Sequence, residues 1–165
     1  MIFVTVGTQL AFDRMVGAVD GWAAVTGNEV FAQVGPTDKK FDHIQQSAFL
    51  EPMDFDHYFS AASLVIAHAG MGSILTALSY GKPIIIMPRK ASLNEHRNEH
   101  QLATARRFAT YNGVSVAWDE NELTTLLHRI DKTALEQNLV QISNTAPESF
   151  IQKLRELIND SENAT

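Results

Sequence analysis

Short apolar segments alternate with amphipathic, helix-forming segments along this chain, and this alternation limits the fold more than any other feature. Residues 84–87 are four apolar side chains in a row, and residues 2–6 contain one polar side chain, Thr5. A strand without polar alternation is typically buried on both faces, as in a parallel sheet. Strands separated by helices favour the same arrangement. We therefore expect an α/β fold, a Rossmann-like parallel sheet with helices on both faces.

The same pattern gives the expected order of elements. Strands are expected at residues 2–6, 29–34, 47–50, 64–67, 84–87 and 114–117. Helices are expected at residues 12–23, 54–62, 71–80, 95–110, 119–130 and 147–159. Two pairs have the spacing of helix caps, Asp119 with Glu122 and Thr133 with Glu136, and Pro147 suits the first turn of the last helix.

Length and composition restrict the class of protein. The 165 residues suffice for one domain with its own core. We predict a single domain over residues 1–160 and a frayed tail over residues 161–165. The formal net charge of −6 argues against binding to nucleic acid or anionic lipid through bulk charge. The absence of cysteine excludes a disulfide scaffold, a cysteine nucleophile and a thiolate metal site.

Membrane and targeting signals are not expected. Residues 1–7 have no basic region and no long apolar stretch, so we expect no signal peptide. No apolar run approaches the roughly 20 residues that a membrane-spanning helix needs.

Two glycine-containing turns are expected where ligands bind in such a sheet, beyond the carboxyl ends of the strands. They are residues 7–9 (Gly-Thr-Gln) and residues 68–73 (His-Ala-Gly-Met-Gly-Ser). Glycine lets phosphate oxygens approach the free N–H groups of a helix start, which carries a partial positive charge. Both turns are candidate phosphate sites, although tight packing of strand against helix explains the same glycines. Neither turn has the GxGxxG or the Walker pattern.

A third candidate is the polar segment at residues 94–101 (Asn-Glu-His-Arg-Asn-Glu-His-Gln). Its carboxylates, amides and imidazoles match the donors and acceptors of sugar hydroxyls. Two other interpretations stay open: an exposed polar helix face, or a metal site formed by His96 and His100, which are four residues apart. Because this pair lacks the HExxH pattern and a third ligand, we predict no metal.

Four motifs together resemble a known family. They are residues 3–9 (Phe-Val-Thr-Val-Gly-Thr-Gln), 67–78 (Ala-His-Ala-Gly-Met-Gly-Ser-Ile-Leu-Thr-Ala-Leu), 81–89 (Gly-Lys-Pro-Ile-Ile-Ile-Met-Pro-Arg) and 95–101 (Glu-His-Arg-Asn-Glu-His-Gln). In this order they resemble the donor-binding C-terminal domain of glycosyltransferase family 28, the group containing MurG. The resemblance is closest to stand-alone bacterial subunits of the PssE/EpsE type, which are similar to the catalytic subunit of the split UDP-N-acetylglucosamine transferase of N-glycan assembly.

The resemblance implies the half of a GT-B glycosyltransferase that holds a UDP-sugar. It places these residues around the donor: Gly7, Thr8, Gln9, His68, Gly70, Met71, Gly72, Ser73, Thr76, Arg89, Glu95, His96, Glu99, His100 and Gln101. The two turns surround the diphosphate, His100 and Gln101 contact sugar hydroxyls, and residues 49–53 hold the uracil. Thr76 stands where many relatives have a glutamate that binds ribose, so ribose binding is expected to be weaker or to come from Glu95 or Glu99.

The expected activity is that of an inverting hexosyltransferase subunit that needs neither a metal nor a cofactor. The acceptor hydroxyl attacks the anomeric carbon of the UDP-sugar, and UDP leaves. Backbone N–H groups near residues 71–73, with Arg89 or His96, stabilise the charge on the leaving diphosphate. No catalytic base is assigned, and His68 and His96 are the candidates.

Split members of the family take the acceptor-binding half from a second subunit. The implied partner is a PssD-like, membrane-anchored subunit that presents a lipid-linked saccharide acceptor in exopolysaccharide or capsule biosynthesis. We expect a cytoplasmic protein that its partner recruits to the inner face of the membrane, active only in that complex and without nucleic acid. The alternative is a non-catalytic module, similar to a donor domain, that stabilises or stimulates a partner transferase. A nicotinamide-dependent enzyme is disfavoured because the GxGxxG fingerprint is missing.

Overall fold

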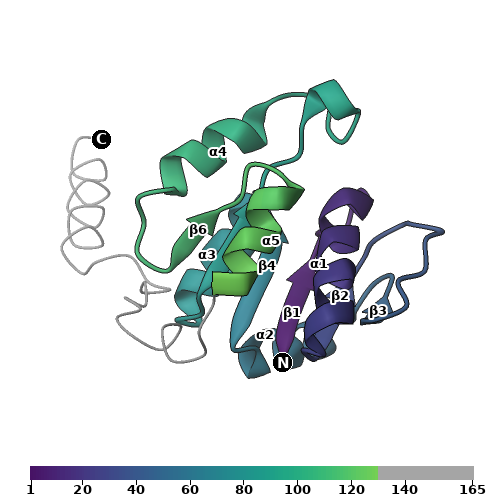
Figure 1. Ribbon diagram of the computed structural model, residues 1–165. Coiled ribbons are helices and arrows are strands. Elements are labelled where there is room, and N and C mark those ends of the chain that lie inside the picture. Colours follow the sequence, from purple (N-terminus) through teal and green to yellow (C-terminus); the bar gives the residue numbers. More distant parts are fainter. Residues whose placement is uncertain (130–165) are drawn as a thin grey trace, which may run out of the picture.

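The computed structural model describes residues 1–129, which form a six-stranded parallel sheet between two layers of helices (Figure 1). The strand order is β3-β2-β1-β4-β5-β6, and every neighbouring pair is parallel. The strands are β1 Ile2–Thr5, β2 Val30–Gln33, β3 Gln45–Ser47, β4 Leu64–His68, β5 Ile84–Met87 and β6 Val114–Val116. The predicted parallel α/β sheet is confirmed.

Helices cover both faces of the sheet, as predicted. They are α1 Asp13–Thr26, α2 Pro52–Ala61, α3 Met71–Ser79, α4 His100–Phe108 and α5 Glu120–Arg129, with a short 3₁₀ helix, η1, at Ala91–Leu93. Buried residues of α1 and α5 share one core with the sheet, and those of α2, α3 and α4 share the other. In Figure 1, α1 and α5 lie on the near side of the sheet.

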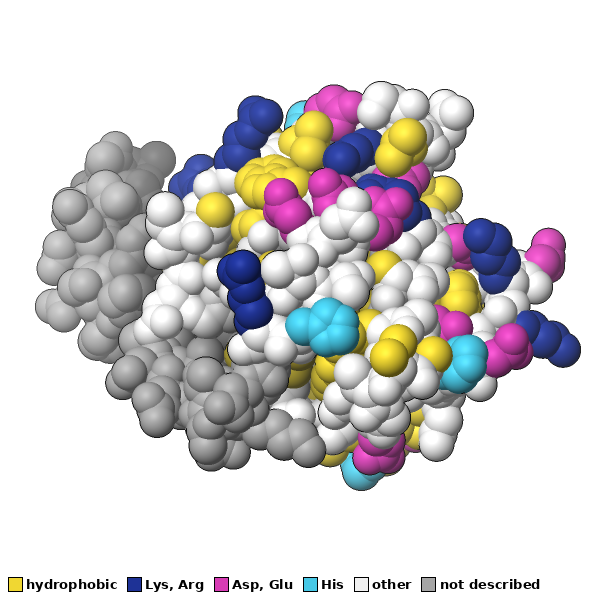
Figure 2. Space-filling model, viewed as in Figure 1, with side chains coloured by type: hydrophobic (Ala, Val, Ile, Leu, Met, Phe, Trp, Pro, Cys, Tyr) yellow, Lys and Arg dark blue, Asp and Glu magenta, His cyan; other side chains and the backbone are white. Residues whose placement is uncertain are grey.

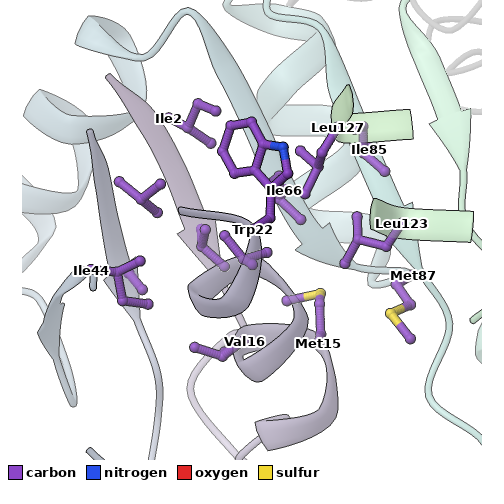
Figure 3. Packing of buried hydrophobic residues seen from close by; sticks show 14 of the residues in the cluster. Ile2, Met15, Val16, Trp22, Ile44, Ile66, Ile85, Met87, Leu123 and Leu127 are labelled. Atoms are coloured by element: carbon purple, nitrogen blue, oxygen red, sulfur yellow. The ribbon is translucent and has the colours of Figure 1, made fainter. Parts of the chain in front are cut away.

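Successive residues of the central strands supply the two cores alternately. Ile2 and Val4 of β1 belong to the core under α1 and α5, whereas Phe3 belongs to the core under α2 and α3. Figure 3 shows Trp22 of α1 and Leu127 of α5 meeting over the sheet in the first of these cores. Because both faces of a central strand are buried, its sequence does not alternate between apolar and polar residues as that of a half-exposed strand does.

The predicted strand at residues 47–50 is wrong, because β3 ends at Ser47. The apolar pair Phe49 and Leu50 suggested the strand, but both residues follow it, and Phe49 is 51% exposed. Leu50 instead donates its N–H to Oε1 of Gln33 at 3.2 Å. The following helix begins at Pro52, two residues before the predicted start, with proline in the first turn where it is favoured.

The predicted helix at residues 95–110 is wrong in its first turn, because α4 begins at His100. Side chains of the segment hydrogen-bond nearby backbone N–H groups and compete with the helix. Glu95 Oε2 accepts from the Lys90 N–H at 2.9 Å, and Asn98 Oδ1 accepts from the His100 N–H at 3.2 Å. His96 therefore does not share a helix with His100. Within residues 1–129, no group of three or more His, Asp or Glu side chains is placed to hold a metal ion.

The predicted cap of α5 is confirmed. The Glu122 N–H donates to Oδ1 of Asp119 at 2.9 Å, and the Glu122 carboxylate accepts from the Trp118 N–H at 3.0 Å. The predicted helix at residues 147–159, the Thr133–Glu136 pair and the tail at residues 161–165 lie outside the described residues.

Acidic and basic side chains are interspersed over the face that carries α1 and α5, with hydrophobic side chains between them (Figure 2). Among the helices of residues 1–129, none combines the length and the apolar composition that a membrane crossing requires.

Candidate functional site

A cavity of about 670 Å³ opens at the carboxyl ends of β1 and β4, the point where the strand order reverses. Parallel α/β sheets bind ligands at this point because the loops after the two strands diverge to opposite faces. Six segments line the cavity: the loop after β1, the end of β2, the region around the start of α2, the end of β4, the start of α3 and the segment after β5. The lining residues are Thr5, Val6, Gly7, Thr8, Gln9, Leu10, Gln33, Leu50, Pro52, Phe55, Asp56, His68, Gly72, Ser73, Arg89, His96 and Gln101.

The structure brings most of the sequence-predicted site residues to this cavity. Those that line it are Gly7, Thr8, Gln9, His68, Gly72, Ser73, Arg89, His96 and Gln101. Those outside its lining are Gly70, Met71, Thr76, Glu95, Glu99 and His100. Of the segment predicted to hold the uracil, residues 49–53, Leu50 and Pro52 line the cavity.

Both glycine turns pack closely against the imidazole of His68. A Cβ atom on Gly70 would be 2.2 Å from His68 Nε2, and one on Gly7 would be 2.9 Å from His68 Cε1. Gly70 has an ordinary extended backbone, φ −88°, which any residue can adopt. At position 7 the backbone itself also favours glycine, because φ is +79°. The histidine ring, rather than the backbone, therefore makes glycine necessary at position 70.

His68 is held in its neutral form. Burial, followed by the nearby Arg89 guanidinium and then His96, lowers the pKa of His68 to about 4. Its Nδ1 is buried without a hydrogen-bond partner in the described part of the chain. A group of this pKa is a weak base at neutral pH, which disfavours His68 as the base that takes the acceptor proton.

Arg89 is a buried cation that holds the loop after β1. Its guanidinium donates to the carbonyls of Val6 at 3.0 Å, Leu10 at 2.7 Å and Ala11, and its Cζ lies 4.6 Å from the centre of the Phe12 ring. Burial lowers the pKa of Arg89 to about 10, which leaves the group charged at neutral pH.

The charge of Arg89 is not neutralised by a direct ion pair within residues 1–129. The cavity wall therefore carries a positive charge bound only to neutral acceptors, which favours an anionic ligand. Gln101 supports the same residue, because its Oε1 accepts from the Arg89 N–H at 3.1 Å. The Nε2 group of Gln101 is the part that remains for a ligand.

Gln33 is a site residue that the sequence analysis missed. Its Nε2 donates to the Gly7 carbonyl at 3.1 Å, and its Oε1 accepts from the Leu50 N–H. It thereby ties the first glycine turn to the segment before α2. The signal in the sequence was a buried amide at the last position of an apolar strand, where the side chain reaches the ligand edge of the sheet. Phe55 and Asp56 of α2 were also missed.

Glu95 and Glu99 shape the segment after β5 instead of lining the cavity. Glu95 forms two hydrogen bonds to the Arg14 guanidinium, at 2.7 and 2.9 Å, and accepts from the Lys90 N–H. Glu99 Oε1 accepts from the Ala91 N–H at 3.1 Å. Thr76 lies in the second turn of α3, away from the cavity lining. The predicted contacts of Glu95, Glu99 and Thr76 with the ribose stay predictions, and this geometry does not favour them.

The start of α3 supplies the remaining polar groups. Gly72 and Ser73 line the cavity in the first turn of this nine-residue helix. The first N–H groups of a helix have no intrahelical acceptor, and the helix dipole adds positive potential there. With Arg89, this turn makes one side of the cavity suited to a phosphate or diphosphate group.

Comparison with known proteins agrees with this geometry. The family described as "Glycosyltransferase family 28 C-terminal domain" matches residues 1–160. The UDP-N-acetylglucosamine transferase subunit ALG13 of Eremothecium gossypii is 32% identical over 156 residues, which are 93% of this chain and 71% of that protein. The mouse protein of the same name is 31% identical over 108 residues, and the match spans 9% of its length.

Solved structures show the same fold. The solution structure of ALG13 superposes with a TM-score of 0.56 and 19% identity, covering 93% of both chains. MurG of Acinetobacter baumannii superposes with a TM-score of 0.58 and 19% identity, covering 84% of this chain and 44% of that one. The fold is therefore that of one half of a GT-B enzyme, as the resemblance implied.

Proposed function

The chain belongs to the glycosyltransferase family 28 C-terminal domain family, and on that premise we propose that it binds a UDP-sugar and supplies the donor site of a glycosyltransferase. The single observation that carries this proposal is the cavity between the two glycine turns at the β1–β4 switch point, with the Arg89 guanidinium, which has no direct ion pair in residues 1–129, in its wall. A relative that is 32% identical is named as a UDP-N-acetylglucosamine transferase subunit, which supports the same class of donor.

The polarity of the cavity suggests how a donor lies in it. The diphosphate faces the start of α3 and the loop after β1, where Ser73 and Thr8 offer hydroxyls and Arg89 offers charge. The apolar side chains Leu50, Pro52 and Phe55 suit the flat uracil ring. His96 and Gln101, on the segment after β5, are left for the sugar hydroxyls.

The chemistry that this chain supplies is stabilisation of the leaving group. As the bond between the anomeric carbon and the diphosphate oxygen breaks, negative charge grows on the diphosphate. Preorganised N–H groups of α3, the Ser73 hydroxyl and the Arg89 charge oppose that growth without a metal ion. Direct attack by the acceptor hydroxyl inverts the anomeric centre. The proton of that hydroxyl goes to a base that we place on the partner, because an imidazole with a pKa of about 4, as in His68, is a weak base, and His96 is assigned to the sugar hydroxyls.

The acceptor half of the enzyme is proposed to come from a second, membrane-anchored subunit that carries a lipid-linked saccharide. The match covers 44% of the MurG chain, which supports a separate subunit as the source of the other half of a two-domain cleft. We propose a hexose or hexose derivative as the transferred group and exopolysaccharide or capsule biosynthesis as the process. The protein acts in the cytoplasm at the inner membrane face.

Calorimetric titration of the purified chain with UDP tests the donor site. ADP and GDP serve as controls for the base, and EDTA serves as the control for a metal ion. We expect selective UDP binding that EDTA does not change. Binding of all three nucleotides with equal affinity, or loss of UDP binding in EDTA, contradicts the proposal.

Measurement of turnover distinguishes an enzyme subunit from a non-catalytic module that stimulates a partner transferase. The co-expressed pair is assayed for UDP release and for product, with the wild-type chain, with Ser73→Ala and with Gly70→Ala. An enzyme subunit loses turnover in Ser73→Ala or, where backbone N–H groups alone hold the diphosphate, in Gly70→Ala, whereas a stimulating module keeps turnover in both variants.

A further inference from the structure

The cavity contains one carboxylate within the described residues, that of Asp56 on α2, among groups that otherwise favour an anion. Arg89 is charged, the start of α3 contributes positive potential, and His68 is neutral. Asp56 repels a diphosphate, so it does not belong to the part of the site that holds phosphate. A donor nucleotide places its uncharged nucleoside there instead.

Asp56 is also free to bind a ligand. Its side chain is exposed, and it has no hydrogen-bond or ion-pair partner in residues 1–129. The two carboxylates that the sequence suggested for this role, Glu95 and Glu99, are both occupied by contacts within the fold.

The surroundings of Asp56 indicate which part of a nucleoside it meets. Pro52, Phe55 and Asp56 stand at positions i, i+3 and i+4 of α2, so they share the helix face that lines the cavity. Phe55 is anchored in the core by an edge-to-face contact with Phe3, with ring centres 5.5 Å apart. An apolar surface beside a carboxylate fits a base next to the hydroxyl-bearing ribose.

We propose that Asp56 accepts hydrogen bonds from the ribose hydroxyls of the donor nucleotide and makes the site selective for ribonucleotides over deoxyribonucleotides. The inference rests on the proposed function, because it takes the ligand to be a nucleoside diphosphate. A carboxylate has two acceptor oxygens and no donor, which matches the paired O–H groups of a vicinal diol. Such charge-assisted bonds are about twice as strong as neutral ones.

The experiment is calorimetric titration of the full chain with UDP and with 2′-deoxy-UDP, neither of which carries a transferred sugar. The variants are Asp56→Asn and, as the matched control, Asp54→Asn. Asp54 is exposed on the same helix and does not line the cavity. We expect the wild-type chain and Asp54→Asn to bind UDP at least about tenfold more tightly than 2′-deoxy-UDP. This ratio corresponds to the loss of one hydrogen bond to a charged group. We expect Asp56→Asn to reduce that ratio to about threefold or less.

Each outcome bears on a different claim. An unchanged ratio in Asp56→Asn, with UDP still bound, overturns the role of Asp56 and leaves the proposed function standing. Equal loss of both nucleotides in Asp56→Asn, with the thermal unfolding temperature of the wild type, assigns Asp56 to the base and also overturns the proposal. If the wild-type chain binds neither nucleotide, alone or co-expressed with its partner, the proposed function fails and the Asp56 proposal fails with it.

Discussion

The ring of His68 occupies the space in which a side chain at Gly70 would begin: a Cβ there would lie 2.2 Å from His68 Nε2. His68 ends β4 and Gly70 precedes α3, so this contact joins the strand to the turn that leads into the helix. The first glycine turn approaches the same ring through Gly7, where a Cβ would lie 2.9 Å from His68 Cε1. Both glycine turns thus pack against one imidazole.

Replacing Gly70 by alanine is expected to displace the His68 ring and lower the affinity for UDP at least about tenfold. The backbone of Gly70 suits any residue, so the effect comes from the ring and not from the conformation. The double variant His68→Ala/Gly70→Ala removes the clash and is expected to bind UDP more tightly than Gly70→Ala alone. The measurement is calorimetry on the four members of this cycle.

Gly21→Ala is the control for that cycle. Gly21 lies in the interior of α1, and a Cβ there would meet nothing within 4 Å. The change is expected to leave UDP affinity unaltered and to stabilise the fold by up to about 1 kcal/mol. If Gly70→Ala binds UDP as the wild type does, the close packing of Gly70 against the His68 ring is not needed for donor binding.

Ser73→Ala is expected to reduce turnover by the complex with its partner about 10²–10³-fold, because one preorganised donor to the leaving diphosphate is lost. Ser60→Ala, at the far end of α2, removes a hydroxyl that bonds the His57 carbonyl, and it is expected to leave turnover unchanged. Turnover is followed by release of UDP. Full activity in Ser73→Ala refutes a role for this hydroxyl, although not for the backbone N–H groups beside it.

The stability of the protein is expected to fall between pH 6.5 and pH 4 in part because of His68. The pKa of His68 is about 4 in the folded chain and 6.5 in the unfolded chain. In that interval the unfolded chain binds a proton that the folded chain does not, so the free energy of unfolding rises with pH. The slope from one such group is at most about 1.4 kcal/mol per pH unit.

His68→Gln isolates this contribution. Carboxylates also affect stability over the same interval, and they do so equally in both proteins. The difference between the urea-unfolding free energies of wild type and variant is therefore expected to shrink from pH 7 to pH 4. A difference that stays constant over this range shows that His68 is not held neutral by burial.

Arg89→Lys is expected to destabilise the fold by about 2–4 kcal/mol, because an ammonium cannot reach all three loop carbonyls and leaves buried acceptors unsatisfied. The affinity for UDP is expected to fall as well, since the loop after β1 loses its support. Urea unfolding and calorimetry measure the two effects. The control is Arg107→Lys, an exposed position of α4, and wild-type stability in Arg89→Lys contradicts the structural role.

Glu95→Gln separates folding from donor binding. It weakens the partly buried pair with Arg14 and is expected to cost about 1–2 kcal/mol of stability, while UDP affinity changes less than about threefold. Unfolding free energy and calorimetric titration with UDP are the two measurements. A large loss of UDP affinity at unchanged stability restores the contact between Glu95 and the ribose that the sequence suggested.

Much of the fold could be predicted from local pattern. The apolar run at residues 84–87 and the cap formed by Asp119 and Glu122 depend on neighbours within a few positions, and both are confirmed. Both glycine turns could be placed on the same grounds, because a parallel sheet brings the carboxyl ends of its strands to one edge. The start of α4 could not be predicted in this way, since side chains such as Asn98 accept hydrogen bonds from backbone N–H groups that would otherwise belong to the helix.

The sequence by itself determined the layered sheet and its turns, because periodicity is a property of adjacent residues, and its four motifs carried the resemblance to the family. Only the tertiary structure decided the roles of the charged side chains. Arg14 and Glu95 are 81 positions apart, and Arg89 reaches carbonyls 78 to 83 positions before it. Contacts between residues so far apart in the sequence form only when helices and loops pack against the sheet. That packing engages Glu95 within the fold and leaves Asp56 open to the cavity.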